Sequence, residues 1–390
     1  MRKGFLMEKL KIAKPDIRAI TKLVPPEGNL VQGQSELPIH PELAAEASKI
    51  ISSSQNHYGP SEGDLNLRKA VAEKIKRFNG IEVDPTKPQV IITNGGTGAL
   101  VGIAASFLEG KSVLVFDPYY PYHRRIVEQF GGRTERFELD DDLKFNKDEL
   151  YQACKRLKFR NEYPLSAIVV CSPANPTGKV MTQLELESIA DIAMSLDLLV
   201  ISDEVYEHYV SAENPHISIA SLPGMWQRTI TVNSFSKSWN ISGWRLGYCY
   251  GPTELITPIN SAANVIYVCP ATPLQAALAK ILLKEHDYYE KLTNIFSGKK
   301  MFLSQKLRQL GFEIYDSGSS FYLWARIPQG FSDAMSFNQI LIEKRQVAGV
   351  PGNAFSDSER WNSFMRFCVA RDDKILESAV ERIQAALSDD

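Results

Sequence analysis

The residues that could do chemistry follow several apolar runs of the sequence. The run LLVIS leads into Asp203, TITVN leads into SFSK with Lys237, IVVCSP leads to Asn175, and VLVFDP leads to Tyr120. In open parallel sheets, ligands bind in the crevice beyond the carboxyl ends of the strands. We therefore expect these four side chains to converge on one crevice.

These residue types suit a phosphorylated cofactor that is held by a lysine. An amine after a buried strand can form a Schiff base when burial or a nearby cation deprotonates it. Arg245, eight residues beyond Lys237, can supply that cation and a fixed pair of donors for a phosphate. A buried Asp203 can keep a pyridine nitrogen protonated, which makes the ring an electron sink. The three side chains together indicate a pyridoxal phosphate site.

A glycine-rich turn offers a second part of the phosphate site. Gly95 and Gly96 follow the apolar run QVIIT and precede a helical stretch, where free backbone N–H groups and the helix dipole favour a phosphate. A dinucleotide fingerprint would need a glycine where the chain has Val101, and an ATP-binding loop ending at Lys111 would need one at Ala105. The turn therefore predicts a site for one phosphate.

The chain around these residues alternates between apolar runs and stretches with helical periodicity. Runs that are apolar throughout are typical of strands buried on both faces, which predicts an α/β domain with a mostly parallel sheet covered by helices on both faces. The run WRLGYCYG predicts a strand that starts near Arg245. A helix is predicted over 182–197, where Thr182 and Glu185 form a capping box and Leu184 shares an apolar face with Ile189.

Domain boundaries are predicted from changes in this pattern. Prolines in the first 55 residues indicate an arm without long regular elements. We expect residues 1–50 to form this arm and part of a small domain, and residues 51–285 to form the large cofactor-binding domain. Residues 286–390 then form a C-terminal small α+β domain, with a long charged helix at its start and a second helix at its end.

Composition narrows the class of protein. The 390 residues carry a net charge of −2, which argues against nucleic acid or an anionic membrane as a partner. No apolar run approaches the roughly 18–20 residues of a membrane span, and the N-terminus lacks the pattern of a secretory signal, so we expect a cytoplasmic protein. The five cysteines are scattered without metal-binding spacing, which predicts reduced thiols, most of them in the core, and no metal site.

The motifs also occur in the order and spacing of a known family. The chain resembles the class I/II aminotransferases of the fold-type I pyridoxal phosphate enzymes. The specific part of the resemblance is SFSK followed at fixed spacing by GWRLGY, behind NPTG and SDEVY in that order. Further matches are YGPSEGDLNLRKA, TNGGTGAL, DPYYPYH, PGNAF and MRFCVA. The resemblance covers nearly the whole chain and implies an aspartate aminotransferase-like fold.

The resemblance implies a role in cofactor binding for many of the matching residues. Lys237 matches the Schiff-base lysine and proton shuttle, Asp203 the partner of the ring nitrogen, and Tyr206 and Asn175 the donors to the phenolic oxygen. Tyr120 matches the ring that stacks on the cofactor. The implied phosphate cup comprises Gly95, Gly96, Thr97, Ser234, Ser236 and Arg245.

Further matches concern the substrate and a second subunit. Arg366 and Asn175 match the residues that bind the substrate carboxylate, and Gly33 matches a backbone position that closes near it. Tyr58 matches a tyrosine that reaches the phosphate of the neighbouring subunit, which implies a homodimer with shared active sites.

The implied activity is that of an aminotransferase of amino acid metabolism. The amino group of an L-amino acid would pass to a 2-oxo acid by a ping-pong mechanism through an aldimine of Lys237. A carbon–sulfur β-lyase or a γ-eliminating synthase would use the same lysine, so both stay open as alternatives. A non-catalytic, aminotransferase-like regulator is a more remote alternative, because the residues before Tyr58 already form the arm. The sequence leaves the amino donor and the oxo-acid acceptor open.

Overall fold

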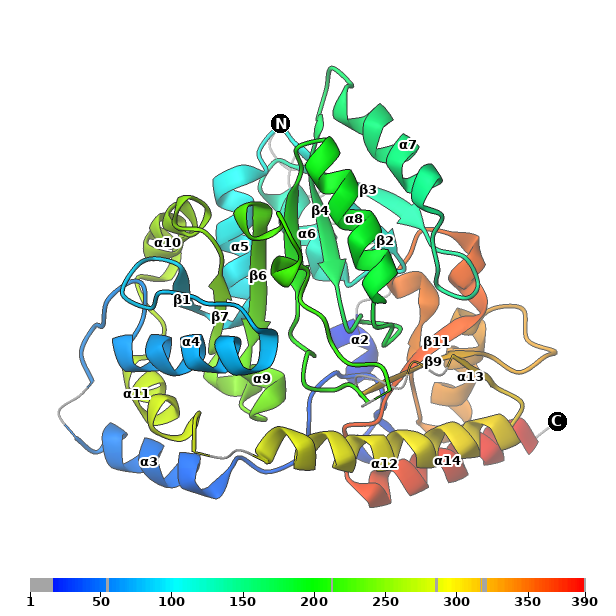
Figure 1. Cartoon of the computed structure of the whole chain (residues 1–390). Coiled ribbons are helices and arrows are strands. Elements are labelled where there is room, and N and C mark those ends of the chain that lie inside the picture. Colours follow the sequence, from blue (N-terminus) through cyan, green and yellow to red (C-terminus); the bar gives the residue numbers. More distant parts are fainter. Residues whose placement is uncertain are drawn as a thin grey trace, which may run out of the picture. The chain divides into compact units, whose positions relative to one another are not determined.

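The computed structural model describes residues 17–53, 56–211, 213–284, 287–315, 317 and 321–388 (Figure 1). The first 16 residues of the predicted arm thus lie outside the described residues. The chain forms two compact units. The smaller unit takes the described residues up to Gly33, those of Gly298–Asp316 and those from Phe321 onward, and the larger unit runs from Gln34 to Ser297 and includes Ser317.

The larger unit is built on a seven-stranded sheet with the strand order β1-β7-β6-β5-β4-β2-β3. Its strands are β1 (Val90–Thr93), β2 (Ser112–Asp117), β3 (Arg133–Glu138), β4 (Leu165–Cys171), β5 (Leu199–Asp203), β6 (Thr229–Ser234) and β7 (Gly247–Tyr250). Strand β7 runs antiparallel to both of its neighbours, β1 and β6, and the other pairings are parallel. The prediction of a mostly parallel sheet is confirmed.

Helices cover both faces of this sheet, as predicted. One face packs on α5 (Gly95–Phe107), α6 (Pro121–Gln129) and α10 (Thr253–Tyr267), whose apolar residues form one cluster with Ile91 and Cys249. The neighbouring strand positions Val90 and Tyr248 point to the opposite face and pack on α3 (Pro41–Ile51), α4 (Leu65–Asn79) and α11 (Thr272–Ile281). In Figure 1, α4 and α8 (Gln183–Ser195) lie in front of the sheet and α5 lies behind it. Helix α7 (Lys147–Lys158) packs on α8 and β4.

Some predicted elements differ from the structure for identifiable reasons. The arm was expected to lack long regular elements, yet α3 has 11 residues. Pro41 occupies the first turn of α3, where a proline costs no hydrogen bond. The helix expected over 182–197 is α8, with the predicted capping box, but Leu184 is 75% exposed and Leu186 takes its place in the core.

The smaller unit contains a four-stranded antiparallel sheet in the order β10-β11-β9-β8. Its strands are β8 (Glu313–Tyr315), β9 (Tyr322–Arg326), β10 (Val350–Pro351) and β11 (Phe364–Cys368), and its helices include α2 (Ile17–Thr21), α13 (Ala334–Arg345) and α14 (Asp373–Ser388). The long charged helix of the sequence is α12 (Tyr288–Gln309), and the final helix is α14. This mixture of short strands and helices matches the predicted α+β character.

Two further expectations concern the cysteines and the membrane. All five cysteines are free thiols, and Cys154, Cys249 and Cys368 are buried, as expected for core residues. Across the described ranges of the chain, every helix is too short or too polar to pass through a bilayer.

Candidate active site

Lys237 lies directly after β6, in the single helical turn α9 (Phe235–Ser238). Ser234, the last residue of β6, caps this turn by accepting the backbone N–H of Ser236 at 3.2 Å. The lysine is half-buried, and its backbone carbonyl accepts a hydrogen bond from the Tyr209 hydroxyl at 2.6 Å. The end of a central strand therefore positions the lysine, as the sequence predicts.

The start of α5 lies against the side chain of Arg245. Gly95 has a φ of +71°, and a Cβ atom built on it would be only 2.5 Å from Nη2 of Arg245. A glycine is therefore needed for the guanidinium to lie at this helix end. The first N–H groups of a helix have no acceptor within the helix, and the Asn94 side chain caps none of them. The N–H groups and the guanidinium together form a cradle for an anion.

Arg245 differs from its prediction in one respect. It was expected at the start of a strand, but it follows a short 3-10 turn, Ser242–Trp244, and β7 begins only at Gly247. The reason is its left-handed backbone, with a φ of +55°, which is incompatible with strand pairing. This turn leaves the side chain exposed, and Nη1 donates to the carbonyl of Ser242 at 3.0 Å.

Close backbone contacts bring the remaining predicted cup residues to the same place. A Cβ atom on Gly247 would lie 2.6 Å from the carbonyl carbon of Gly95 and 2.7 Å from the nitrogen of Gly96, so β7 abuts the start of α5. Ser234 pairs with Gly247 across β6 and β7. Thr97 lies in the first turn of α5. The structure therefore gathers the predicted phosphate-binding groups around one helix end.

Asp203 has a partner that the sequence analysis did not single out. Its Oδ2 lies 2.7 Å from Nε2 of His123, and both side chains are almost fully buried. His123 belongs to α6, whose N-cap is Tyr120, and the two rings meet edge to face at a centroid distance of 5.4 Å. His123 lies in the motif DPYYPYH, three residues after Tyr120, but nothing in the sequence connects it with Asp203, which is 80 positions away.

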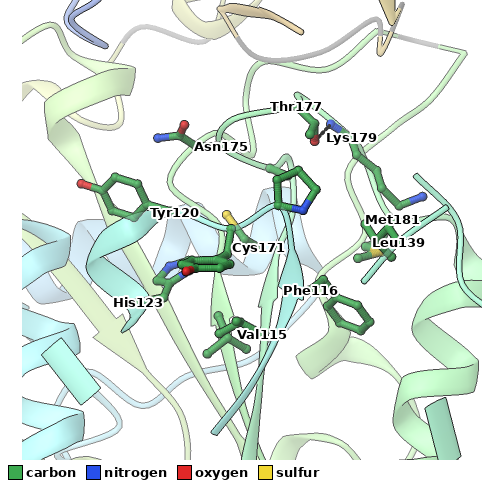
Figure 2. A pocket seen from close by; sticks show the side chains of 14 residues that line it. Val115, Phe116, Tyr120, His123, Leu139, Cys171, Asn175, Thr177, Lys179 and Met181 are labelled. Atoms are coloured by element: carbon green, nitrogen blue, oxygen red, sulfur yellow. Dashed lines mark hydrogen bonds between the residues drawn. The ribbon is translucent and has the colours of Figure 1, made fainter. Parts of the chain in front are cut away.

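Tyr120 and His123 border a pocket in the larger unit (Figure 2). Tyr120, His123 and Asn175 lie around Cys171, which is at the end of β4. Asn175 lies in a loop that two hydrogen bonds of 2.8 Å close. The Ala174 N–H donates to the Lys179 carbonyl, and the Gly178 N–H donates to the Ala174 carbonyl. Burial and the charge of Asp203 raise the pKa of the Cys171 thiol, so Cys171 is a neutral wall of the pocket.

Tyr206 follows a residue that lies close to the start of α5, and Tyr58 lines a separate hollow. Tyr206 is buried, and the side chain of its neighbour Val205 lies 3.5 Å from where a Cβ atom on Gly96 would be. Tyr58 is 87% exposed. It lines a shallow hollow with residues 56–57 and 269–273, and no other predicted cofactor residue lines that hollow.

Arg366 and Gly33 belong to the smaller unit, where one aromatic residue connects them. The guanidinium of Arg366 lies over the ring of Tyr322 at 4.3 Å and over that of Phe355 at 4.9 Å, and Nη2 donates to the Val31 carbonyl at 2.5 Å. A Cβ atom on Gly33 would be 1.8 Å from the Tyr322 hydroxyl, so only glycine fits there. Arg366 is buried and rigidly held, which suits a bidentate carboxylate contact.

The residues of the larger unit fit a phosphorylated pyridine cofactor. The uncapped start of α5, the serine hydroxyls and the Arg245 guanidinium are donors suited to a phosphate. The buried carboxylate of Asp203 suits a protonated ring nitrogen. Lys237 lies on the same edge of the sheet as both groups, because β5 and β6 are parallel neighbours.

Comparisons with known proteins identify the relatives of this chain. The family model for class I and II aminotransferases matches residues 27–383. The chain is 33% identical over 345 residues to the aspartate aminotransferase of Pyrococcus abyssi, covering 87% of this chain and 86% of that protein. It is 32% identical over 348 residues to an aromatic-amino-acid aminotransferase of Thermococcus litoralis, covering 88% and 87%. The structure of the N-succinyldiaminopimelate aminotransferase from Mycobacterium tuberculosis matches with a TM-score of 0.89 and 32% identity, covering 95% and 96% of the two chains.

Proposed function

The chain belongs to the class I and II aminotransferases, and from this premise we propose that it uses pyridoxal 5'-phosphate held covalently by Lys237. The proposed substrates are an L-amino acid and a 2-oxo acid. The observation that carries the proposal is the set of groups at one sheet edge: Lys237 after β6, Asp203 with its histidine partner at the end of β5, and Arg245 at the start of α5.

Each of these residues has a distinct task in the proposed reaction. The cofactor, when bound, supplies an electron sink that makes the α-proton of an amino acid acidic. Asp203 holds a proton at the pyridine nitrogen, and His123 keeps the carboxylate oriented. The Nζ of Lys237 removes the α-proton and delivers it again, which is general acid–base catalysis by one group. Tyr206 and Asn175 donate to the phenolic oxygen.

The substrate is proposed to bind through its carboxylate. Arg366 offers two parallel N–H donors, and Asn175 offers an amide. Transfer of an amino group in two half-reactions predicts ping-pong kinetics, because the first 2-oxo acid product leaves before the second 2-oxo acid binds at the same site. Proteins similar to this chain are named for aspartate, aromatic amino acids and N-succinyldiaminopimelate, so these substrates belong in the first panel tested.

We further propose that the active unit is a homodimer. Val265, Ile266 and Val268, at the end of α10, are 87%, 48% and 47% exposed, and Tyr58 borders the hollow that continues from them at Cys269. An exposed apolar patch of this kind is typical of a protein interface. A second copy of the chain is the proposed occupant, and Tyr58 is the residue proposed to serve the neighbouring site.

The catalytic proposal is tested by replacing the lysine. Lys237→Ala is expected to bind the cofactor without a covalent link and to lose transamination, because the Nζ of Lys237 is the group proposed to move the α-proton. The visible absorption of the wild-type protein reports the link, and the panel of amino acids should bleach it without an acceptor. Normal turnover in the variant contradicts the proposal, as does release of pyruvate and ammonia from cystathionine without an oxo acid, which indicates a lyase.

The dimer proposal is tested by charging the apolar patch. Val265→Lys is expected to shift the protein from dimer to monomer in sedimentation velocity, because a buried unpaired ammonium destabilises an interface by several kcal/mol. Val265→Leu is the matched control and should remain dimeric. A wild-type protein that sediments as a monomer at micromolar concentration would refute the homodimer.

A further inference from the structure

Two hydrogen bonds connect the turn after β5 to the segment that carries Lys237. The Tyr209 hydroxyl donates to the main-chain carbonyl of Lys237 at 2.6 Å. The Glu207 carboxylate accepts from Nδ2 of Asn233, and Oδ1 of Asn233 accepts the backbone N–H of Ser234 at 2.7 Å. The segment 233–237 is therefore held at its first residue and at its last.

The segment around Lys237 forms few hydrogen bonds within itself. Helix α9 consists of a single turn, from Phe235 to Ser238, and so short a helix has few internal hydrogen bonds. The Lys237 carbonyl lies in the last turn, where carbonyls need partners from outside the helix. The backbone N–H groups of Trp239 and Asn240 also approach this oxygen, and the Tyr209 contact at 2.6 Å is shorter than that of Asn240 at 3.4 Å.

The Tyr209 hydroxyl is itself well positioned. The side chain is 3% exposed, and its ring contacts the rings of Phe296, at a centroid distance of 5.5 Å, and Tyr206, at 6.3 Å. Tyr206 is the residue proposed to donate to the phenolic oxygen. Tyr209 thus contacts both the phenol-binding residue and the backbone of the lysine.

The second contact depends on a carboxylate that stays ionised. Glu207 is 1% exposed and pairs with the ammonium of Lys74 on α4, and its Oε2 accepts from Asn79 at 2.9 Å. Burial is the largest single influence and by itself raises the pKa of Glu207, but Lys74, His208 and His216 together outweigh it and lower the pKa to about 2. At neutral pH, Glu207 is therefore a permanently charged acceptor for Asn233.

We propose that Tyr209 is a positioning residue for Lys237, with the Glu207–Asn233 contact as its second support. The proposal rests on the proposed function of Lys237. By fixing the main chain of the lysine, Tyr209 restricts where Nζ lies relative to a cofactor bound by Asp203 and Tyr206. Good geometry in both half-reactions depends on this restriction, because misplacement of a catalytic group lowers the rate of the chemical step.

The experiment compares Tyr209→Phe with Tyr288→Phe as a matched control. The Tyr288 hydroxyl is also buried and close to α9, since its ring stacks on Trp239 at 4.4 Å, but it has no hydrogen-bond partner among the residues that the structure describes. Three quantities are measured for each protein: the rate at which the apoprotein links added pyridoxal phosphate, the pH midpoint of the visible band, and kcat and KM separately.

Tyr209→Phe is expected to slow linking and kcat by roughly five- to tenfold, the effect of one hydrogen bond, and to shift the pH midpoint of the band. KM for the amino donor should stay within about twofold, and the control should match the wild type in all three quantities. Asn233→Ala should slow linking in the same direction and thereby test the second support.

The outcomes separate this inference from the proposed function. A wild-type protein without a lysine-linked band contradicts the proposed function and, with it, this inference. If the wild type shows the band and Tyr209→Phe equals Tyr288→Phe in linking rate, pH midpoint and kcat, the positioning role is overturned. A loss of thermal stability in Tyr209→Phe with these quantities unchanged also overturns it, because the hydroxyl is then only structural.

Discussion

The carboxylate of Asp203 is held at Oδ2 by His123 and, through a longer hydrogen bond of 3.4 Å, at Oδ1 by the backbone N–H of Val205. The closest atoms of His123 and Asp203 lie 2.7 Å apart, and the two side chains are 1% and 5% exposed. A buried hydrogen bond of this kind fixes the direction in which the second carboxylate oxygen points. The strength of the proposed contact between Asp203 and the ring nitrogen therefore depends on His123, which is not itself proposed to touch the cofactor.

His123→Phe is expected to lower cofactor affinity and kcat by about tenfold each, because it removes one buried hydrogen bond while keeping an aromatic ring beside Tyr120. Equilibrium binding of pyridoxal phosphate and steady-state kinetics check the two quantities. His123→Asn, which keeps a donor, should recover part of the loss. If affinity and kcat are unchanged in His123→Phe, Asp203 does not depend on the histidine.

The sequence identifies strand-end residues better than it identifies their partners. Lys237 and Asp203 stand out because each interrupts an apolar run, and the structure places both at the carboxyl edge of the sheet. His123 does not stand out, because a histidine on a helix is most often a core residue. Its partner is 80 positions away, and only the packing of α6 on the sheet brings the two together.

At the scale of elements, the start of α8 is tied to the wall of the pocket. Thr182 and Glu185 form the capping box, with the Glu185 N–H donating to Oγ1 of Thr182 at 3.2 Å and the Thr182 N–H donating to Oε2 of Glu185 at 2.9 Å. The other oxygen of Glu185 accepts from Lys179, a pocket residue, at 2.7 Å. Glu185 therefore both caps the start of α8 and holds the pocket residue Lys179.

Thr182→Ala is expected to destabilise the larger unit by about 1 kcal/mol, the usual effect of losing an N-cap side chain. Thr182→Ser keeps the hydroxyl and should retain nearly the full stability. Urea unfolding followed by circular dichroism measures the difference. Equal stabilities of the alanine and serine variants would show that the capping box contributes nothing.

The sequence predicts a strand where burial on both faces of the sheet requires a continuous run of apolar residues. The apolar runs of β2, β4 and β6 are visible because these strands are buried on both faces. Strand β3 has the sequence RTERFE and pairs only with β2 at the edge of the sheet, so its charged residues stay partly exposed. Because its sequence contains no apolar run, the sequence analysis did not predict this strand. A polar edge strand gives no apolar signal.

At the scale of the whole molecule, acid stability depends on a buried neutral imidazole. His208 is buried, stacks on Tyr289 at 3.6 Å and has no partner at Nδ1 among the described residues. Burial lowers its pKa from 6.5 to about 3, an effect that the charge of Glu207 only partly opposes. Between pH 6.5 and 3, His208 is therefore neutral in the folded protein but protonated in the unfolded chain.

Below pH 6.5 the unfolded state binds one more proton at His208, so the free energy of unfolding falls as the pH is lowered towards 3. The contribution of this group approaches about 1.4 kcal/mol per pH unit. Glu207, whose pKa is lowered from 4.5 to about 2, adds a loss only below its ordinary pKa. His208→Phe should flatten the slope by one proton between pH 6.5 and 3, as measured by urea unfolding, and an unchanged slope would refute this explanation.

The fold class was predictable for the whole molecule, whereas the direction of one strand was not. The aspartate aminotransferase-like fold implied by the resemblance is confirmed by the TM-score of 0.89. The run WRLGYCYG predicts the strand β7, but an apolar run does not indicate whether a strand is parallel or antiparallel to its neighbours. The structure shows that β7 runs antiparallel to both β1 and β6. Strand order likewise depends on contacts far apart in the sequence.

The reversal of β7 makes the lysine and the arginine members of one closed loop. Residues 235–246 leave the sheet at Ser234 and return at Gly247, and these two residues pair with each other. The distance between Lys237 and Arg245 is therefore set by the length of a single loop anchored at both ends. Insertion of a residue into this loop would therefore change that distance even if every side chain around it stayed the same.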